Sequence, residues 1–197
     1  GKVTLRGRPV QFTDVHSSLK AGVAYLSEDR KGKGLLLTKD LTVNLTLASL
    51  GKFIRGLQID RKREAQALDK AIEDFDIRTG TKTILAGQLS GGNQQKLLLA
   101  KMMLLDPQVV IIDEPTRGID IGNKEQIYKF IAALAAEGRS IIVVSSEMPE
   151  LIGICDRILV MRGGRIVGEV QGDHMTENEI VQLATGVNVG RDAGEAA

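Results

Sequence analysis

The stretch VVIIDEP, which runs from Val109 to Pro115, decides the fold of this 197-residue chain. Four consecutive β-branched residues predict a strand that is buried on both faces, as in a parallel sheet. Asp113 and Glu114 follow, so two carboxylates close the strand at its C-terminal end. Such acids suit a site where Asp113 holds Mg²⁺ through water and Glu114 activates a water beside an anionic ligand. A capping loop is the alternative, and the cost of burying two unpaired carboxylates counts against it.

Two other apolar stretches, Val23–Leu26 and Ser140–Val144, also predict buried strands. A helix expected over Asn123–Glu137 separates the strand at Val109 from the one at Ser140. Strand, helix and strand in this order predict a parallel crossover unit. The sequence therefore predicts an α/β fold with a mostly parallel sheet.

The ends of the chain carry shorter β signals. Val3–Arg6 and Pro9–Phe12 predict an N-terminal antiparallel β portion around the turn at Gly7-Arg8. Asp156–Val170 predicts a hairpin with a two-residue turn at Gly163-Gly164. A helix expected over Met175–Ala184, with Thr176 as a possible N-cap, precedes a tail at residues 187–197 that we expect to be flexible.

The middle of the chain, Asp40–Leu105, shows helical periodicity and no strong strand signal. Asp60 is a plausible N-cap for a helix over Arg61–Phe75, whose apolar residues Ala65, Leu68, Ile72 and Phe75 form one stripe. This contrast predicts a helical subdomain at residues 40–105, inserted into a core formed by residues 1–39 and 106–186.

A second polar stretch, LSGGNQQK at Leu89–Lys96, precedes a helical run expected over Leu97–Leu105. A helix N-terminus carries unpaired N–H groups and a partial positive charge, so it suits an anion. The glycines allow close backbone approach, and Ser90 adds a hydroxyl donor. Taken alone, a Ser-Gly-Gly turn is more often an ordinary cap for a buried helix.

Glu28 lies in the polar run that directly follows the strand at Val23–Leu26. The carboxyl end of a strand in an α/β sheet is where ligand-contacting groups gather. A solvated charged loop is the alternative, and this segment alone favours it.

Composition excludes several classes of protein. The formal net charge is +1 and aromatic residues make up 3%, so neither bulk attraction to nucleic acid nor a set of base-stacking platforms is expected. Cys155 is the single cysteine, so an internal disulfide is impossible and a buried structural thiol is expected. No apolar run approaches the ~18 residues that span a membrane.

The polar stretches together resemble an ABC-type ATPase, a member of the P-loop NTPase class. LSGGNQQK resembles the signature motif, Asp113-Glu114-Pro115 the end of Walker B, and Thr116–Asp120 the D-loop. Tyr25–Lys31 and Ser145–Glu150 narrow the resemblance to the second nucleotide-binding half of monosaccharide importers, and within them to the ribose type. In that family one polypeptide holds two fused ATPase halves.

The resemblance implies ATP and Mg²⁺ as cofactors, an ATP-hydrolysing activity, and roles for individual residues. Asp113 would assist Mg²⁺, and Glu114 would be the general base. The nucleotide contacts would be made by signature and D-loop residues, several of them to a γ-phosphate held mainly by the opposite half: Ser90, Gly91, Gly92, Gln94 and Asp120. Asp120 would also communicate across the interface between the halves.

Three departures from the family pattern matter. The 197 residues contain no Gly-x-x-x-x-Gly-Lys-Ser/Thr loop, so we expect that element upstream of Gly1 and expect the isolated chain to be inactive. Glu28 stands where the Q-loop has Gln, and an ionised carboxylate repels phosphate unless Mg²⁺ lies between them. Ser146 stands where the switch His sits and cannot carry its charge. These two site residues predict that the chain's own ATP site hydrolyses poorly.

The resemblance also implies partners and a location. The helical subdomain would face a transmembrane permease at the cytoplasmic face of the inner membrane. The second partner would be another nucleotide-binding half, and an external sugar-binding protein would take part only indirectly. One alternative is the ATPase head of a nucleic-acid maintenance protein, but the short insertion at residues 40–105 has neither heptads nor a cysteine cluster. The other is a non-catalytic dimerisation module.

Overall fold

The computed structural model describes residues 1–186, and the expected flexible tail lies outside them. The chain forms two compact units, one at Gly1–Val144 and one from Ser145 onward, which are described separately. The expected grouping of residues 106–186 with residues 1–39, around an inserted subdomain at residues 40–105, stays a prediction.

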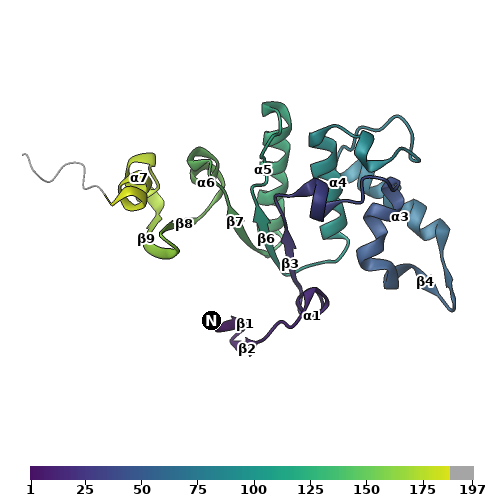
Figure 1. Cartoon of the computed structure of the whole chain (residues 1–197), viewed down its shortest axis with the longest axis horizontal. Helices are drawn as coiled ribbons and strands as arrows, with labels where there is room; N and C mark the ends of the chain where they lie inside the picture. Colours follow the sequence, from purple (N-terminus) through teal and green to yellow (C-terminus); the bar gives the residue numbers. More distant parts are fainter. Residues whose placement is uncertain (187–197) are drawn as a thin grey trace, which may run out of the picture. The chain divides into compact units, whose positions relative to one another are not determined.

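The first unit is built on a parallel sheet of three strands, β3 (Val23–Leu26), β6 (Val109–Asp113) and β7 (Ser140–Val144). Its order is β3-β6-β7, with Val23 opposite Val109 and Val109 opposite Ser140 (Figure 1). The predicted strands and the parallel crossover are therefore confirmed. Because all three strands run the same way, their carboxyl ends, including Asp113, meet at one edge of the sheet.

The two faces of this sheet differ in burial. Ala24, Val110 and Ile112 point to a buried face, and α1 and α4 contact β3 while α5 contacts β7. On the other face Tyr25 and Ile142 are about half exposed, at 55% and 52%. The strand at Val109–Asp113, which was predicted to be buried on both faces, is buried on one face and half-buried on the other, because β-branched composition alone does not report what covers each face.

Two helices beside the sheet begin earlier than the sequence suggested. Helix α4 spans Gly91–Met103 and helix α5 spans Ile121–Ala136. Runs of apolar residues locate the helix interior but not its first turn, which begins with Gly91-Gly92 in α4 and with Ile121-Gly122 in α5. In both helices a capping side chain marks the true start.

The N-terminal residues form the antiparallel pair β1 (Val3–Leu5) and β2 (Arg8–Val10), followed by helix α1 (Val15–Lys20). The two residues between the strands are Arg6 and Gly7, both with positive φ, so the turn lies one residue earlier than predicted. After β3, a single π-helical turn at Arg30–Gly34 leads toward the helical region.

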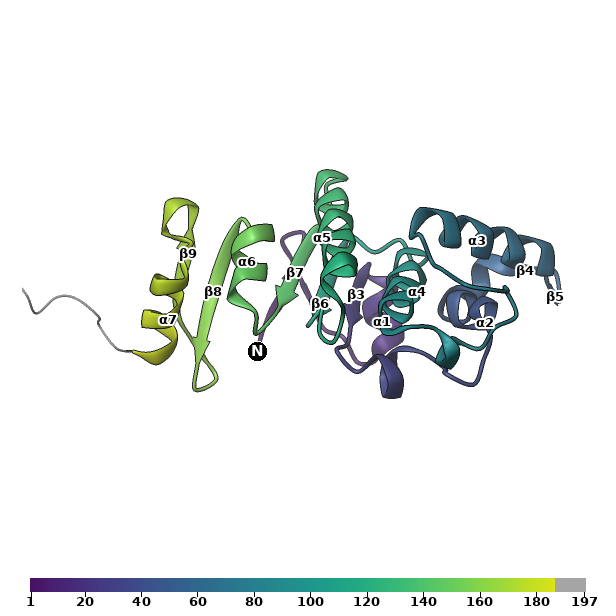
Figure 2. The same ribbon diagram turned by 90° about the horizontal axis from the view of Figure 1, so that it is seen from above.

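Residues 40–105 are largely helical, as predicted. They contain helix α2 (Leu41–Thr46), helix α3 (Arg61–Asp74), α4, and two 3₁₀ segments at Leu47–Phe53 and Ala86–Gln88. Asp60 caps α3 by accepting a hydrogen bond from the Arg63 N–H. Helix α2 contacts both α3 and α4 (Figure 2).

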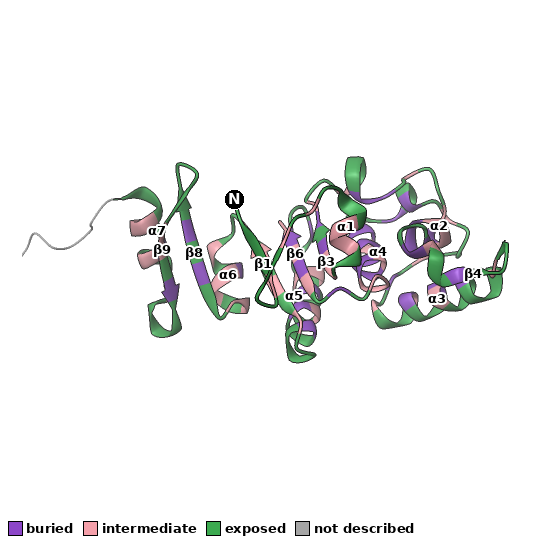
Figure 3. Cartoon of the chain, turned by 90° about the horizontal axis from the view of Figure 1, so that it is seen from below, coloured by how far each residue is buried: buried purple, intermediate pink, exposed green. Residues whose placement is uncertain are grey.

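Two details of this region were missed. A short hairpin, β4 (Ile54–Arg55) and β5 (Gln58–Ile59), precedes α3. Most of α3 is exposed, with buried positions on one side (Figure 3), but Ala65 of the predicted stripe is exposed and Glu64 is buried instead. Glu64 is accommodated because it accepts hydrogen bonds from Thr46 and Arg61.

The second unit contains a hairpin between two helices. Helix α6 (Met148–Ile154), which periodicity did not reveal, comes first. The hairpin of β8 (Arg157–Arg162) and β9 (Arg165–Gln171) turns at Gly163-Gly164, as predicted. Thr176 caps helix α7 (Glu177–Thr185) after a 3₁₀ turn at Gly172–His174. Cys155 is half-buried among apolar neighbours, and burial raises the pKa of its thiol.

Candidate functional site

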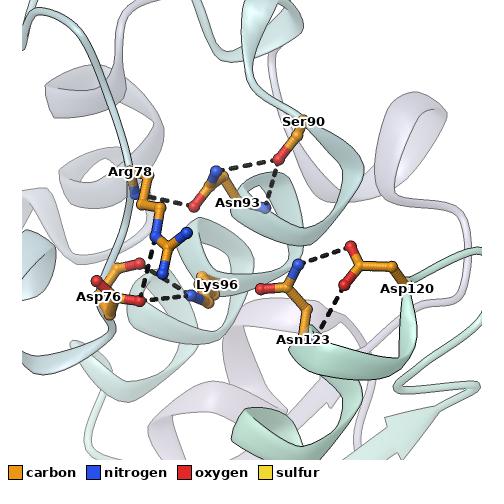
Figure 4. Close-up of polar contacts among 7 residues, drawn as sticks. All are labelled: Asp76, Arg78, Ser90, Asn93, Lys96, Asp120 and Asn123. Atoms are coloured by element: carbon orange, nitrogen blue, oxygen red, sulfur yellow. Dashed lines mark hydrogen bonds and ion pairs between the residues drawn. The ribbon is translucent and has the colours of Figure 1, made fainter.

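Ser90 is the N-cap of helix α4 and lies inside the stretch that first suggested an anion site. The Ser90 hydroxyl accepts hydrogen bonds from the Asn93 backbone N–H at 3.4 Å and the Asn93 side-chain amide at 3.0 Å (Figure 4). The first turn of α4 carries no acidic residue. Ser90 and Gly91 are exposed, so a neutral cap leaves the positive end of this helix open to solvent.

Gly92 brings the start of α4 against the start of α5. A Cβ atom at Gly92 would lie 2.9 Å from Nδ2 and 3.0 Å from Cγ of Asn123. Asn123 cannot easily move away, because its side chain donates to Asp120 at 2.7 Å. A glycine is therefore needed at this position to let the two helix N-termini meet.

Asp120 is the N-cap of α5 rather than a residue in mid-loop. Its carboxylate accepts hydrogen bonds from the Asn123 side chain at 2.7 Å and the Asn123 backbone N–H at 3.1 Å (Figure 4). These bonds stabilise the ionised form and hold the pKa of Asp120 below its usual value. The start of α5 thus already carries its own negative charge.

The loop after β3 reaches both helix starts. Arg30 donates to the carbonyl oxygen of Gly91 at 2.9 Å and to that of Arg117 at 2.8 Å. Arg117 in turn forms an ion pair with Glu28. Glu28 is therefore held by a guanidinium in this structure, and it lies near the loop that leads to Asp120.

The strand end places Asp113 and Glu114 at the carboxyl edge of the sheet. Tyr25 donates its hydroxyl to Oδ2 of Asp113 at 2.7 Å, which raises the pKa of Tyr25. Glu114 adopts φ +48°, and its N–H donates to the carbonyl of Val144 at 2.8 Å. A left-handed conformation at a non-glycine residue costs free energy and is typical of functional sites.

Two residues of the signature stretch face inward instead. Gln94 is 4% exposed, and its amide donates to the carbonyls of Ala86 and Leu89. Lys96 is equally buried and donates to the backbone and carboxylate of Asp76 (Figure 4). The Gln94 side chain thus supports the segment that precedes α4, and its expected nucleotide contact stays a prediction.

Ser146 belongs to the second unit, in the exposed segment before α6. Its neighbour Ser145 accepts a hydrogen bond from the Glu147 N–H at 3.0 Å and contacts Glu150. In the first unit the structure brings together the predicted residues Ser90, Gly92 and Asp120.

Four contacting residues were not singled out from the sequence: Tyr25, Arg30, Arg117 and Asn123. Arg30, Arg117 and Asn123 lie in loops or near helix starts, where periodicity carries no information, and Tyr25 lies in β3, where a strand pattern does not reveal its contact with Asp113. Tyr25 and Arg30 lie in the stretch Tyr25–Lys31, which resembles one family closely. That resemblance was the one feature of the sequence that could have marked them as site residues.

Nothing in residues 1–186 groups three or more His, Cys, Asp or Glu side chains into a metal-binding cluster. None of the helices described is long and apolar enough to cross a membrane. A divalent cation at this edge would thus need oxygen ligands from a bound phosphate and water beside a protein carboxylate, as is usual for Mg²⁺.

Residues 1–117 match the protein family described as "ABC transporter". The ribose import ATP-binding protein RbsA 2 of Agrobacterium fabrum is 45% identical over 197 residues, which are 100% of this chain and 39% of that protein. The L-arabinose transport ATP-binding protein AraG of Geobacillus stearothermophilus is 42% identical, over 94% of this chain and 36% of that protein. The chain thus spans well under half the length of these curated relatives.

Solved structures share the fold at low sequence identity. A nucleotide-free ATP-binding cassette from an ABC transporter superposes with a TM-score of 0.76 and 17% identity, covering 93% of this chain and 76% of that one. A dimeric ATP-binding cassette in a post-hydrolysis state, bound to ADP and Pi, gives a TM-score of 0.71 and 19% identity, covering 87% of this chain and 73% of that one.

Proposed function

The chain belongs to the ABC transporter family, and we propose that it acts as a nucleotide-binding half of an importer for ribose or a similar monosaccharide. Its similarity to ribose and arabinose import ATP-binding proteins supports this substrate class. We propose that ATP hydrolysis drives the import and that this chain offers its signature motif to an ATP held mainly by a second half.

The observation that carries the proposal is the open start of α4. Ser90 caps this helix without a charge, and Ser90 and Gly91 are exposed. Backbone N–H groups and an uncompensated helix dipole attract a phosphate. The neighbouring start of α5 does not compete for that phosphate, because the Asp120 carboxylate occupies it.

At the strand end we assign Asp113 to Mg²⁺ and Glu114 to the attacking water. Asp113 fits Mg²⁺ because a single carboxylate with phosphate oxygens and water is a usual ligand set for this ion. The cation would neutralise charge on the phosphates when bound. Tyr25 fixes the orientation of the Asp113 carboxylate through its 2.7 Å hydrogen bond, and Glu114 would accept a proton from the water.

The chain's own ATP site is proposed to be the weaker of two. Glu28 replaces the uncharged Gln of the family and is neutralised by Arg117, so it would join a metal only after that ion pair opens. Ser146 replaces a histidine that could carry charge. Asp120, at the start of α5, is proposed to face the second half beside the signature.

We propose that residues 40–105 contact a transmembrane permease at the cytoplasmic face of the inner membrane. The exposed hairpin β4–β5 supports this, because Leu57 at its tip is fully exposed although it is apolar. Exposed apolar side chains at a loop tip suit contact with another protein.

The test is sugar-stimulated ATP hydrolysis by the full-length protein, reconstituted with its permease and sugar-binding protein in vesicles. We expect ribose to stimulate hydrolysis and to be taken up, and we expect Leu57→Ser to weaken stimulation more than basal hydrolysis. The matched control is Leu159→Ser, at an exposed apolar position of β8 in the other unit. Uptake of xylose, arabinose or galactose in preference to ribose would overturn the ribose assignment, and hydrolysis without any sugar dependence would overturn the importer role.

A further inference from the structure

Arg30 occupies an unusual position between two loops of the first unit. Its Nη1 donates to the carbonyl oxygen of Gly91, the first residue of α4, at 2.9 Å. Its Nη2 donates to the carbonyl oxygen of Arg117, in the loop before α5, at 2.8 Å. One planar group thus joins the start of α4 to the loop that precedes α5, which begins at Ile121.

Both segments leave room for the guanidinium. A Cβ atom on Gly118 would lie 3.5 Å from Nη2, and one on Gly91 would lie 3.7 Å from Nη1. Gly118 also has φ +66°, a conformation that turns its loop toward the arginine and that other residues rarely adopt. At both glycines an added Cβ would make only an ordinary van der Waals contact with Arg30, so neither segment crowds the guanidinium.

The segment that carries Arg30 is itself fixed along α4. Asp29 accepts a hydrogen bond from the Gly32 N–H at 2.8 Å, which closes the turn. At Gly34 a Cβ would lie 3.0 Å from Leu98, so this glycine packs directly on the helix. Lys101 donates to the Gly34 carbonyl at 2.9 Å. Arg30 therefore extends from a segment that is tied to α4, and it reaches across to the loop before α5.

We propose that Arg30 is a positioning residue that holds the signature turn at Gly91 in register with the loop that leads to Asp120. This deepens the proposed function and rests on it, because the signature turn is the part offered to ATP. Both terminal nitrogens of Arg30 are directed at backbone carbonyls, so its role is to fix the two loops rather than to bind the nucleotide. The distance between Ser90 and Asp120, which cap the two helices, is then set in part by Arg30.

Lysine cannot replace this residue. An ammonium group is a point donor on a flexible stem, whereas the guanidinium presents donors in a rigid plane. Arg30→Lys keeps the charge but cannot span two carbonyls on separate segments. A comparison of Arg30→Lys with Arg30→Gln therefore separates the geometry of the bridge from its charge.

The first experiment measures amide hydrogen exchange in the full-length protein without nucleotide. We expect Arg30→Gln and Arg30→Lys to speed exchange in the first turn of α4 and at Gly118–Ile119 together. Arg8→Gln, at an exposed arginine of β2, is the matched control and should leave both segments unchanged. Unchanged exchange at either segment in the Arg30 variants would overturn the bridge, whatever the protein's activity proves to be.

The second experiment measures ATP hydrolysis by the same variants reconstituted with the permease. We expect kcat to fall by about tenfold to a hundredfold, because small displacements of ligand-contacting groups cost this much. KM for Mg-ATP should change little, and Arg30→Lys should not restore kcat. A rise in KM with kcat unchanged would mean that Arg30 binds ATP directly and would overturn the positioning role. If the wild-type protein itself shows no hydrolysis, the proposed function fails, while the exchange data still decide the bridge.

Discussion

The starts of α4 and α5 lie against each other and are capped in different ways. Ser90 caps α4 with a neutral hydroxyl, whereas Asp120 caps α5 with a carboxylate that Asn123 holds ionised. Both caps satisfy backbone N–H groups, so both stabilise their helix. The ionised cap also neutralises the dipole of α5, which leaves α4 as the helix start that can receive a phosphate. Both caps therefore stabilise their helices, but only the cap of α4 leaves its helix start available to bind a phosphate.

The largest loss of ATP hydrolysis is expected when the N-cap of α4 becomes a carboxylate, like the N-cap of α5. Ser90→Asp in the full-length protein keeps a good N-cap, so stability should change by no more than about 0.5 kcal/mol. The new charge faces the proposed phosphate position, and ATP hydrolysis should fall by about 10²–10³-fold.

Hydrolysis and thermal unfolding of the same preparation check this expectation. Ser90→Thr is the matched control, because it retains a hydroxyl and adds no charge. Hydrolysis by Ser90→Asp at the wild-type level would show that α4 does not receive an anion.

A smaller effect is expected from separating the two helix starts. Gly92→Ala places a methyl group 2.9 Å from the Asn123 amide and should destabilise the protein by about 1–3 kcal/mol. Gly91→Ala meets no atom closer than 3.6 Å and serves as the control, with an unchanged or slightly higher stability. Urea unfolding of both variants provides the measurement. Equal stabilities for the two would mean that the close approach of Gly92 to Asn123 is not required.

The smallest effect concerns pH. The pKa of Asp120 is lowered in the folded chain, chiefly by the hydrogen bond from the Asn123 side chain. The unfolded state then binds more protons, so this carboxylate stabilises the fold above its unfolded pKa of about 3.9 and stops doing so as pH falls through the lower folded value.

Asp120→Asn keeps a capping side chain without an ionisable group, and it should show less loss of stability on acidification than the wild type. Urea unfolding as a function of pH below 5 compares the two proteins. Parallel stability curves for wild type and Asp120→Asn would contradict the prediction.

The sequence was most informative where composition and spacing act over several residues. The three parallel strands follow from short apolar runs, and β7 was predicted with its bounds at Ser140 and Val144. The N-caps Asp60 and Thr176 were predicted correctly. Each accepts a hydrogen bond from the backbone N–H three residues later, so the cap and its helix are close in sequence and form a recognisable pattern.

The rest of the site depends on contacts that are distant in sequence. The approach of Gly92 to Asn123 and the bridge from Arg30 to Arg117 join segments that no local pattern connects. Gln94 looked like part of an exposed polar turn, but the helix begins at Gly91 and the resulting periodicity turns Gln94 inward. The exposed face of the sheet likewise depends on what packs there, and a strand's own residues do not report that.

We propose that this chain's signature motif serves an active ATP site, whereas the site at its own Asp113 and Glu114 is the weaker one. One comparison of ATP hydrolysis tests this proposal most directly. Two variants of the full-length protein are reconstituted with the permease. The first carries Glu114→Gln, and the second carries the Glu→Gln substitution at the corresponding position of the other nucleotide-binding half. We predict that Glu114→Gln retains most of the hydrolysis, whereas the second variant loses about 10²–10⁴-fold, the usual contribution of a general base. Loss of hydrolysis that is equally complete in both variants would contradict the proposal that the site at Asp113 and Glu114 is the weaker one.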